Sequence, residues 1–431
     1  MDAPDLQPVR IGLLGCGNVG GALVQLLTGD ADGVAHRTGL RFEVRRVAVR
    51  NVARERVVEL PDGCLTHDAE SVVSDPDVDV VVELIGGIEP ARKLVLAALK
   101  QGKPVVTANK ELLANVGAEL FEAAATAGVD LLYEASVAGG IPLIRPLRES
   151  LAGERITRIM GIVNGTTNYI LTRMTEDGAS YGDALAEAQG LGYAERDPTA
   201  DVEGFDAGAK AAILASIAFG VNVVAGDVYR EGISGITPGD IDVARRLGYV
   251  VKLLAIVEKV DDAVAVRVHP AMIPVTHPLA SVRDSFNAVF VEGEAVGELM
   301  LYGRGAGGLP TASAVLGDLV DAAHNLRSRS SGRTGTLRQG RFRAIDELSS
   351  QYYLNLDVVD RPGVLAAVAT VFGEHGVSIR SMEQEGLGDE ARLVFITHRA
   401  RERDVQATLH DLRHLDAVKR VGSLLRVVGP E

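Results

Sequence analysis

Four ionisable side chains lie close together along the chain, on a glycine-rich turn and on the helix expected after it. The turn carries Glu195 and Asp201, and the predicted helix carries Asp206 and Lys210. Because Asp206 and Lys210 are four residues apart, they share one face of that helix. The next segment, residues 211–218, is apolar enough to be buried. Carboxylates around a lysine at the head of a buried helix can bind an ammonium-bearing substrate and transfer a proton.

A glycine loop near the N-terminus points to a nucleotide. Gly15, Gly17 and Gly20 stand between a predicted strand, residues 9–14, and a predicted helix. In this context the first glycine allows a tight turn, and the second lets a pyrophosphate approach the backbone. The third glycine packs the helix against the strand. Together with the lysine and the carboxylates, this loop predicts hydride transfer to or from a small amino acid.

The end of the second predicted strand, residues 42–49, bears on which nicotinamide cofactor is used. Arg50 and Asn51 follow it, with no carboxylate to bind a ribose 2′-hydroxyl. Arg50, together with Arg54 or Arg56, could instead meet a 2′-phosphate, so we predict NADP, with NAD as the alternative. An Arg50 that is only a solvated surface residue remains the competing interpretation.

Two further segments follow predicted strands. Thr107 and Lys110 come just past the end of a parallel strand, where ligands bind in such folds. Lys110 could reach the nicotinamide or the reacting oxygen, or it could face solvent. The segment 164–169 precedes a helix, and its hydroxyls and free backbone N–H groups suit a carboxylate. A capping turn is the simpler interpretation of that segment, and the two are compatible.

Composition limits the class of protein. A net charge of −14 argues against nucleic acid or an anionic membrane as the main partner. Cys16 and Cys64 make no disulfide framework, so a cytoplasmic location is expected. Neither cysteine has an obvious base nearby, which disfavours a thioacyl intermediate. The nine histidines form no metal-ligand cluster. The most apolar helix, residues 211–226, contains Asn222 and is too short to span a membrane.

The order of predicted elements indicates an α/β protein of several domains, as expected for 431 residues. Alternating strands and helices over residues 1–135 predict a Rossmann-like, doubly wound parallel sheet, to which a helix within 303–324 returns. A second α/β domain covers residues 136–302. Residues 325–350, rich in Arg, Ser and Gly, read as a linker. Residues 351–431 show the strand–helix–strand–strand–helix–strand order of a ferredoxin-like domain.

Taken in order, these motifs are specific, and the chain resembles homoserine dehydrogenases along essentially its whole length. The segments that carry the resemblance are 12–20, 107–110, 133–142, 161–171, 190–210 and 303–310. The segment Asp360–Leu365 resembles the ligand-binding turn of an ACT domain, a module that binds amino acids and pairs with itself. The visible departure is Arg196, where the family often has a small residue or proline. No kinase domain precedes residue 1, so a monofunctional enzyme is expected.

The resemblance implies reversible, NAD(P)H-dependent reduction of L-aspartate 4-semialdehyde to L-homoserine, on the path to threonine, methionine and isoleucine. It implies that Lys210 is the acid–base residue, with Asp206 orienting it and Lys110 near the reacting oxygen. The groups implied to contact the substrate are Glu195, Asp201, Gly165 and Thr166.

The resemblance also implies cofactor and cation sites. The residues implied to contact the cofactor are Gly15, Gly17, Asn18, Val19, Gly20, Arg50, Thr107, Lys110 and Gly305. A monovalent cation, sodium in form, would be held mostly through backbone carbonyls of Glu134, Val137, Gly139 and Ile141.

The resemblance further implies that residues 136–302 form a catalytic and dimerisation domain, and that the protein is a homodimer or homotetramer. The ACT segment suggests an amino-acid effector, with threonine the natural candidate. Two rival functions remain open from the sequence. One is another NAD(P)-dependent dehydrogenase of amino-acid metabolism, and the other is a non-catalytic sensor of nucleotides and amino acids.

Overall fold

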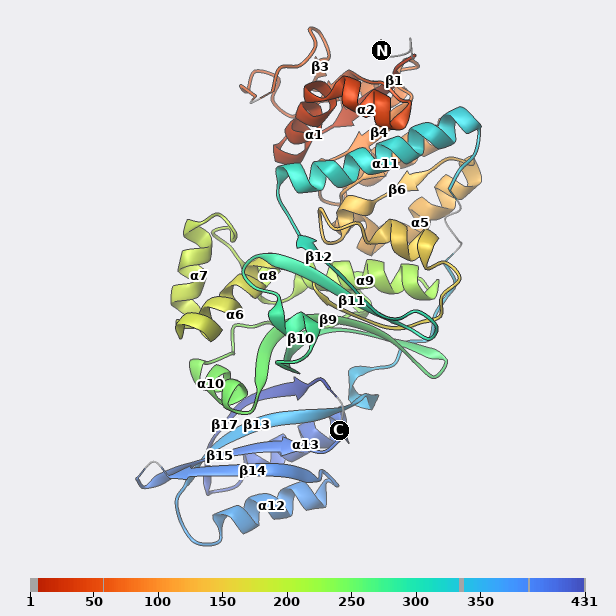
Figure 1. Ribbon diagram of the computed structural model, residues 1–431. Coiled ribbons are helices and arrows are strands. Elements are labelled where there is room, and N and C mark those ends of the chain that lie inside the picture. Colours follow the sequence, from red (N-terminus) through yellow and green to blue (C-terminus); the bar gives the residue numbers. More distant parts are fainter. Residues whose placement is uncertain (1–6, 57, 333–336, 387, 430–431) are drawn as a thin grey trace. The chain divides into compact units, whose positions relative to one another are not determined.

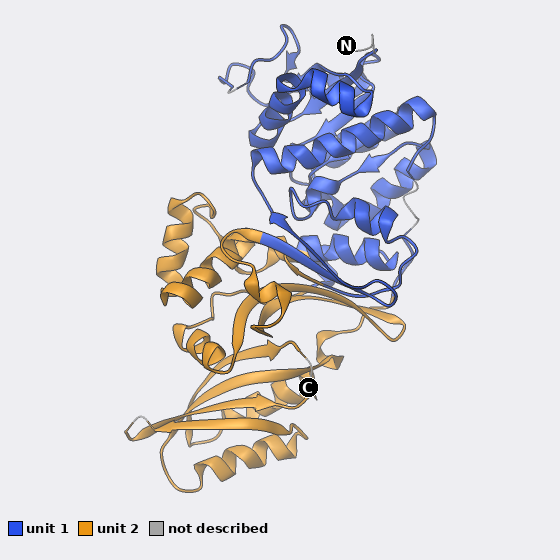
Figure 2. Cartoon of the chain, in the orientation of Figure 1, with its two compact units in different colours: residues 1–159, 209–228, 287–340 blue, residues 160–208, 229–286, 341–431 orange. Residues whose placement is uncertain are grey.

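The computed structural model describes residues 7–56, 58–332, 337–386 and 388–429. The chain forms two compact units, shown in different colours in Figure 2. Unit 1 contains residues 1–159, 209–228 and 287–340, and unit 2 contains residues 160–208, 229–286 and 341–431. Two elements, β7 (Ile156–Ile162) and α9 (Phe205–Phe219), pass from one unit into the other. The glycine loop and the predicted substrate-binding carboxylates therefore belong to different units.

Unit 1 is built on a six-stranded parallel sheet in the order β3-β2-β1-β4-β5-β6 (Figure 1). This order is that of a doubly wound dinucleotide-binding domain, and it confirms the predicted Rossmann-like fold. The strands are β1 (Val9–Leu14), β2 (Phe42–Ala48), β3 (Leu65–Thr66), β4 (Val80–Glu83), β5 (Val105–Thr107) and β6 (Leu131–Leu132). The helices between them are α1 (Asn18–Gly29), α2 (Ala31–Thr38), α3 (Ala69–Ser74), α4 (Ala91–Lys100) and α5 (Lys110–Ala127).

A later helix, α11 (Gly308–Ser328), joins the core of this sheet. It buries Val315 and Leu319 in the same apolar cluster as Leu13 of β1. The linker expected from residue 325 therefore begins inside a helix, and this boundary was wrong. The last turn is held in place because Arg327 donates hydrogen bonds to the carbonyls of Gln7 and Gly39.

The rest of unit 1 consists of short helical turns and a hairpin. The turns are η1 (Glu134–Ser136), η2 (Pro146–Ser150) and η3 (Ala225–Asp227). The hairpin is formed by β11 (Phe286–Gly293) and β12 (Gly297–Arg304). Arg158, at the start of β7, forms an ion pair with Glu292 of β11 at 2.6 Å. This pair fixes the first half of β7 beside the hairpin.

The first part of unit 2 is dominated by a long antiparallel hairpin, β9 (Tyr249–Val260) and β10 (Ala263–Pro274). Two residues connect the strands, and the first, Asp261, has a φ of 54°, as such tight hairpins require. The other elements are α6 (Gly165–Asp177), α7 (Tyr181–Gly190), α8 (Thr199–Val202), β8 (Tyr229–Arg230), α10 (Pro238–Arg246) and η4 (Pro278–Ser281).

The C-terminal part of unit 2 is the ferredoxin-like domain predicted from the element order. Its antiparallel strands follow the order β17-β13-β15-β14. Its elements are η5 (Ile345–Glu347), β13 (Ser349–Val359), α12 (Val364–Glu374), β14 (Ile379–Gly386), β15 (Glu390–Thr397), β16 (Ala400–Arg401), α13 (Glu402–Leu412) and β17 (Val418–Val427). Alternate residues of β13, such as Leu354 and Leu356, pack with α12 and α13 in one core. Tyr353, Asn355 and Asp357 consequently lie on the opposite face of the sheet.

Strand β17 connects the ferredoxin-like sheet to β10, with which it pairs in parallel at residues 271–272. Next to this pairing, the guanidinium of Arg426 is almost completely buried. It lies 2.8 Å from a carboxylate oxygen of Glu231 and 2.7 Å from one of Glu402. Burying a cation is costly unless opposite charges and hydrogen bonds compensate it, and the two carboxylates do so here.

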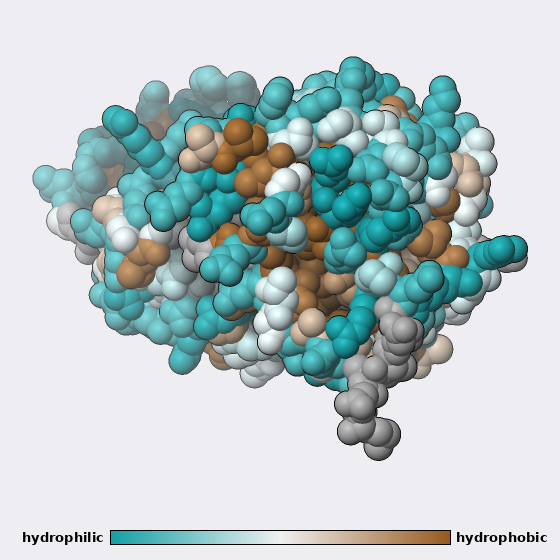
Figure 3. All heavy atoms as spheres, turned by 90° about the horizontal axis from the view of Figure 1, so that it is seen from above, coloured by the Kyte–Doolittle hydropathy of each residue, from teal (hydrophilic) through white to brown (hydrophobic). Residues whose placement is uncertain are grey.

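The surface is largely polar where it is seen in Figure 3. Hydrophilic side chains surround a few groups of hydrophobic ones on that face. Within the described part of the chain, no helix combines the length and the apolar character needed to cross a membrane.

Candidate active site

The glycine loop of unit 1 follows β1 and has the shape of a phosphate cradle. Gly15 has a φ of 98°, and a Cβ there would lie 2.7 Å from the carbonyl O of Leu84. A Cβ at Gly20 would overlap the carbonyl O of Gly15. At Gly17, by contrast, a Cβ would meet no atom within 4 Å among the described residues. The fold therefore requires glycine at two positions, and the third faces open space into which a pyrophosphate fits.

The first turn of α1 completes this cradle. No side chain caps the helix, so its first backbone N–H groups are not used by a capping residue. The helix begins at Asn18 and Val19, both predicted to contact the cofactor. Free N–H groups at a helix N-terminus favour a negatively charged phosphate.

The carboxyl ends of β4 and β5 are tied together by a buried carboxylate that sequence reasoning missed. Glu83 is fully buried and accepts hydrogen bonds from the backbone N–H groups of Ile85 and Gly86. It also accepts one from the hydroxyl of Thr107 at 2.7 Å. Thr107 is thus held by Glu83 at the strand end where ligands bind. A carboxylate at the end of an otherwise apolar strand was the available signal.

Residue 110 begins α5 directly after this strand end. The preceding residue, Asn109, caps the helix through the N–H of Leu112 and donates to the carbonyl of Gly87. Lys110, which is half-buried, therefore stands at a helix start that is anchored on two sides.

The arginines after β2 differ in what they do. Arg56 donates hydrogen bonds to the carbonyls of Asn51, Val52 and Arg54, so it holds the loop in shape. Arg50 is exposed just after the strand. Of the arginines considered for a 2′-phosphate, Arg56 is therefore already engaged.

In unit 2, the side-chain amide of Asn164 forms hydrogen bonds with two of the predicted carboxylates. The Nδ2 of Asn164 donates to Asp201 at 2.6 Å and to Asp206 at 2.9 Å. The hydroxyl of Thr166 donates to the carbonyl of Tyr193 at 2.6 Å and lies 3.2 Å from Asp201. Two carboxylates held close together favour a small cation such as an ammonium.

The local sequence explains why Asn164 occupies this place. Its Oδ1 accepts a hydrogen bond from the N–H of Thr167 and so caps α6, which leaves the Nδ2 to point at the carboxylates. The capping role anticipated for this segment is therefore real. Gly165 meets the chain closely, because a Cβ there would lie 2.7 Å from the carbonyl O of Ser285. The second role of Asn164 could not be inferred from a capping pattern.

Glu195 and Lys210 are the other two predicted residues of this segment. Glu195 is exposed on the same turn, and its carbonyl accepts a hydrogen bond from Gln189. Lys210 is buried in the second turn of α9, four residues after Asp206, and belongs to the part of that helix in unit 1.

In the predicted cation segment of unit 1, the side-chain carboxylate of Glu134 is occupied by backbone hydrogen bonds. The side chain of Glu134 accepts hydrogen bonds from the backbone N–H groups of Leu143, Ile144 and Arg145 at 2.5–2.8 Å. Only its carbonyl oxygen is then left for a cation. Among the described residues, no hydrogen bond reaches the carbonyl oxygens of the remaining three predicted ligands, Val137, Gly139 and Ile141.

Gly305 belongs to a tightly packed corner next to this segment. A Cβ at Gly139 would overlap its carbonyl, and a Cβ at Gly305 itself would overlap the side chain of Asn287. Packing therefore requires a glycine at position 305, independently of any contact with the cofactor.

The two cysteines are poorly suited to nucleophilic catalysis. Burial raises the pKa of both the Cys16 and the Cys64 thiol, so neither is activated as a thiolate. No cluster of three or more His, Cys, Asp or Glu side chains that could hold a metal occurs in the described residues.

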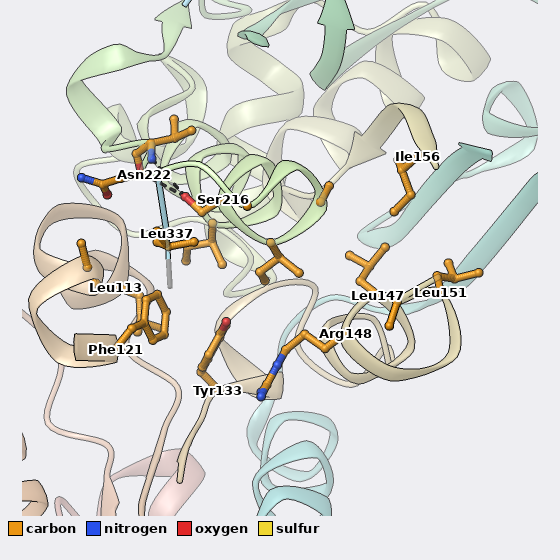
Figure 4. Close-up of a pocket in the computed structure, with 18 of the residues that line it drawn as sticks. Leu113, Phe121, Tyr133, Leu147, Arg148, Leu151, Ile156, Ser216, Asn222 and Leu337 are labelled. Carbon is orange, nitrogen blue, oxygen red and sulfur yellow. Dashed lines mark hydrogen bonds between the residues drawn. The ribbon is translucent and has the colours of Figure 1, made fainter. Parts of the chain in front are cut away.

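Unit 1 also contains a cavity of about 250 Å³, shown in Figure 4. Residues of α5, η2 and α9 line it, including Phe121, Leu147 and Ile213, with Tyr133 and Arg148 at one side. None of the site residues predicted from the sequence lines this cavity.

Comparison with known proteins gives matches over most of the chain. Residues 15–134 match the family described as "Homoserine dehydrogenase, NAD binding domain", and residues 142–320 match "Homoserine dehydrogenase". Residues 352–416 match "ACT domain".

Individual relatives match over nearly the full length. The homoserine dehydrogenase of Corynebacterium glutamicum is 53% identical, over 97% of this chain and 95% of its own. The crystal structure of a homoserine dehydrogenase from Thiobacillus denitrificans superimposes with a TM-score of 0.92 at 42% identity, covering 98% and 99% of the two chains. A hyperthermophilic archaeal homoserine dehydrogenase mutant in complex with NADPH gives a TM-score of 0.62 at 29% identity, over 74% of this chain and 98% of its own.

Proposed function

The chain belongs to the homoserine dehydrogenase family, NAD(P)-dependent oxidoreductases that act on a CH–OH group, and we propose that it interconverts L-homoserine and L-aspartate 4-semialdehyde. The observation that carries this proposal is the cluster in which Asn164 holds Asp201 and Asp206 together. These are carboxylates that the family resemblance assigns to the substrate ammonium and to the orientation of Lys210. The product would feed the synthesis of threonine, methionine and isoleucine.

Substrate binding follows from the charges and donors of unit 2. Asp201 would hold the substrate ammonium, with the exposed Glu195 closing on it from the same turn. The substrate carboxylate would meet the first N–H groups of α6, at Gly165 and Thr166, where a helix N-terminus favours an anion.

Proton transfer is assigned to Lys210, with Asp206 four residues before it on α9. When bound, the nicotinamide supplies or accepts the hydride at the carbon. Oxyanion character then builds on the aldehyde oxygen during reduction, and a lysine ammonium stabilises it and donates the proton. In the oxidation direction the lysine must act as a base, so homoserine oxidation should rise with pH well above neutrality. Lys110 is the second lysine proposed near this oxygen.

We propose NADP as the preferred cofactor. The open space at Gly17 and the uncapped start of α1 fit a pyrophosphate, and the exposed Arg50 would meet a 2′-phosphate. The archaeal relative bound to NADPH supports the same cofactor. Arg50→Gln should lower the ratio of kcat/KM for NADP over NAD by about tenfold, the loss of one charge-assisted contact. An unchanged ratio would show that Arg50 does not select the cofactor.

A monovalent cation, sodium in form, is proposed beside Glu134. The support is that the carbonyl oxygens of Val137, Gly139 and Ile141 receive no hydrogen bond among the described residues, although Val137 and Ile141 are buried. Buried carbonyl groups without a donor are uncommon, and a cation would satisfy them. Measuring activity in sodium, potassium and tetramethylammonium salts tests this, because the last ion is too large to replace the others.

The ACT domain is proposed to make the enzyme sensitive to threonine and to pair copies of the chain into a homodimer or homotetramer. The turn Asp360–Leu365, between β13 and α12, is the segment that resembles a ligand-binding turn.

The cytoplasm is the proposed place of action. The free thiols of Cys16 and Cys64 fit its reducing conditions.

One set of initial rates tests the proposed reaction. Homoserine oxidation is followed by the absorbance of the reduced nicotinamide, with NADP and with NAD, in the presence and absence of threonine. Turnover with NADP that threonine suppresses is the expected result. Absence of turnover with either cofactor would overturn the reaction, and turnover that ignores millimolar threonine would overturn the proposed effector alone.

A further inference from the structure

The carboxyl ends of β4 and β5 are joined by a closed ring of hydrogen bonds, with the carboxylate of Glu83 at its centre. One oxygen of Glu83, Oε1, accepts from the N–H groups of Ile85 and Gly86 at 2.8 Å and 3.2 Å. The other, Oε2, accepts from the hydroxyl of Thr107 at 2.7 Å. One side chain therefore fixes both the chain that leaves β4 and the last residue of β5.

Asn109 closes this ring. Its N–H donates to the hydroxyl of Thr107 at 3.0 Å, and its Nδ2 donates to the carbonyl of Gly87 at 2.7 Å. Gly86 and Gly87 have φ values of 81° and 74°, a conformation that glycine adopts readily. The side chain of Asn109 also caps α5, which begins at Lys110. The position of Lys110 therefore depends on the same set of hydrogen bonds.

The ring requires a carboxylate at its centre. Glu83 is fully buried, and both of its oxygens act as acceptors. A glutamine has nearly the same shape but only one acceptor oxygen. It could serve either the backbone N–H groups or Thr107, and not both. The cost of burying this carboxylate is offset by hydrogen bonds that organise the edge of the sheet where ligands bind.

This ring lies where the nicotinamide half of a dinucleotide is expected. In the strand order β3-β2-β1-β4-β5-β6, the switch point lies between β1 and β4, and a dinucleotide binds across it. The glycine loop after β1 fits the pyrophosphate, and the end of β2 meets the adenosine ribose. The other half of the cofactor then falls at the ends of β4 and β5. The ring adjoins the loop, because a Cβ at Gly15 would lie 2.7 Å from the carbonyl O of Leu84.

We propose that Glu83 is a positioning residue for the nicotinamide half of the cofactor. Glu83 and Thr107 are both fully buried, so they act through the more accessible residues that they hold, 84–88 after β4 and Lys110 at the start of α5. Thr107, which the resemblance implies to contact the cofactor, then supports the site without touching it. The inference rests on the cofactor site proposed above and adds to it a residue outside the glycine loop.

The test compares a whole dinucleotide with its adenine half. NADPH and NADH are titrated into the full chain by calorimetry, and the tighter ligand is used further with its matching half, 2′,5′-ADP or 5′-ADP. A positioning role for Glu83 affects the dinucleotide alone, whereas a general loosening of unit 1 affects both ligands. Asp79→Asn is the matched control, because Asp79 precedes β4 at the end opposite Glu83 and also accepts a backbone N–H, from Arg10 at 2.8 Å.

The variants should differ in dinucleotide binding alone. Glu83→Gln and Thr107→Val should each weaken it about tenfold, the effect of one lost hydrogen bond to a charged group, and leave binding of the adenine half unchanged. Thr107→Ser keeps the hydroxyl and should bind both ligands like the parent chain, as should Asp79→Asn. The double variant with Glu83→Gln and Thr107→Val should bind no more weakly than the weaker single variant, because both changes break the same contact.

Unchanged dinucleotide binding by Glu83→Gln would overturn the inference, and so would an equal loss of the adenine half. Additive losses in the double variant would also overturn it, because Glu83 would then not act through Thr107. If Glu83→Gln does not fold, the two substitutions at Thr107 decide: a serine variant as weak as the valine variant would contradict a role for the hydroxyl. These titrations contain no homoserine, so a failure of the proposed reaction would be seen separately, in the initial rates.

Discussion

The glycine loop of unit 1 and the carboxylate cluster of unit 2 are built in opposite ways. The loop is a continuous segment in which close contacts require glycine at two positions, Gly15 beside Leu84 and Gly20 beside Gly15. The cluster joins Asn164, Asp201 and Asp206, which are up to 42 residues apart, through one amide. A site made from one segment can be predicted from local spacing, whereas a site made from several depends on a residue whose type alone does not reveal it.

The largest effect is expected at the helix that carries residues of both units, α9. Lys210→Met should lower kcat for homoserine oxidation by about 10²–10⁴-fold, the usual contribution of a general acid or base. Lys100→Met, at an exposed helix end, is the control and should change nothing. A loss below tenfold at Lys210 would transfer the role to Lys110 or to water, and Lys110→Met would then decide between them.

The next prediction separates the two roles of Asn164. Asn164→Ser keeps a helix cap for α6 but cannot reach both carboxylates, and Asn164→Ala loses both functions. Hydrogen bonds to charged groups contribute about 1.5–3 kcal/mol, so both variants should raise the KM for homoserine roughly 10–100-fold. Only the alanine variant should also lose about 1 kcal/mol of stability. A serine variant with an unchanged KM would show that the cluster is structural.

A pair of alanine variants in the loop distinguishes a glycine that is needed for packing from one that is needed for cofactor binding. Gly20→Ala forces a Cβ against the carbonyl of Gly15 and should reduce the free energy of unfolding by about 1–3 kcal/mol. Gly17→Ala meets no protein atom, so its melting temperature should not change. Its KM for NADPH should nevertheless rise about tenfold, because the Cβ would occupy the space in which the pyrophosphate approaches the backbone and would weaken a hydrogen bond to it. Equal melting temperatures for the two variants would contradict the distinction.

The smallest effects should come from pH, with opposite signs in the two units. In unit 1, burial raises the pKa of Asp318 to about 7. The folded carboxyl then keeps a proton that the unfolded chain releases between about pH 4 and 7, so the free energy of unfolding falls as pH rises through that range. In unit 2, burial lowers the pKa of Lys252 to about 8. The unfolded chain keeps a proton there up to about pH 10, so the free energy of unfolding rises with pH above 8.

Each slope is at most about 1.4 kcal/mol per pH unit for one group. Urea unfolding at pH 5, 7, 8 and 10 measures both, with Asp318→Asn and Lys252→Met as the variants that should each flatten one of the two ranges. If the Lys252→Met chain keeps the rise above pH 8, another group is responsible for it.

Much of the fold could be predicted because its signals are local. Strand β1 and the order of elements in the ferredoxin-like domain follow from apolar runs and turn residues. The length of β10 could not be predicted, because this strand is buried at almost every position and shows no alternation to mark its ends. The end of α11 was missed because it depends on Arg327 reaching carbonyls some 290 and 320 residues away in the sequence.

The candidate site divides in the same manner. The three glycines of the loop were assigned from spacing, and the structure gives each a physical reason. Glu83 and Asn164 were not assigned, since a carboxylate after a strand and an amide before a helix are common at ordinary turns. Their functions depend on partners that only the folded chain brings near. Glu195 illustrates the opposite case. It was assigned because it is near Asp201 in the sequence, but its side chain does not join the hydrogen bonds of Asn164.

The pairing of β17 with β10 has a consequence for any shortened form of the enzyme. One side of β10 is covered by β9, and the other is covered piecewise: by a bridge from Phe342 to Val264, by β8 at residues 267–268, and by β17 at residues 271–272. Two of these three pieces come from the chain after residue 340. Removing the ACT domain would therefore expose part of an apolar strand edge, and such edges recruit other chains. The ACT domain is thus expected to protect the sheet that contains β10 against aggregation.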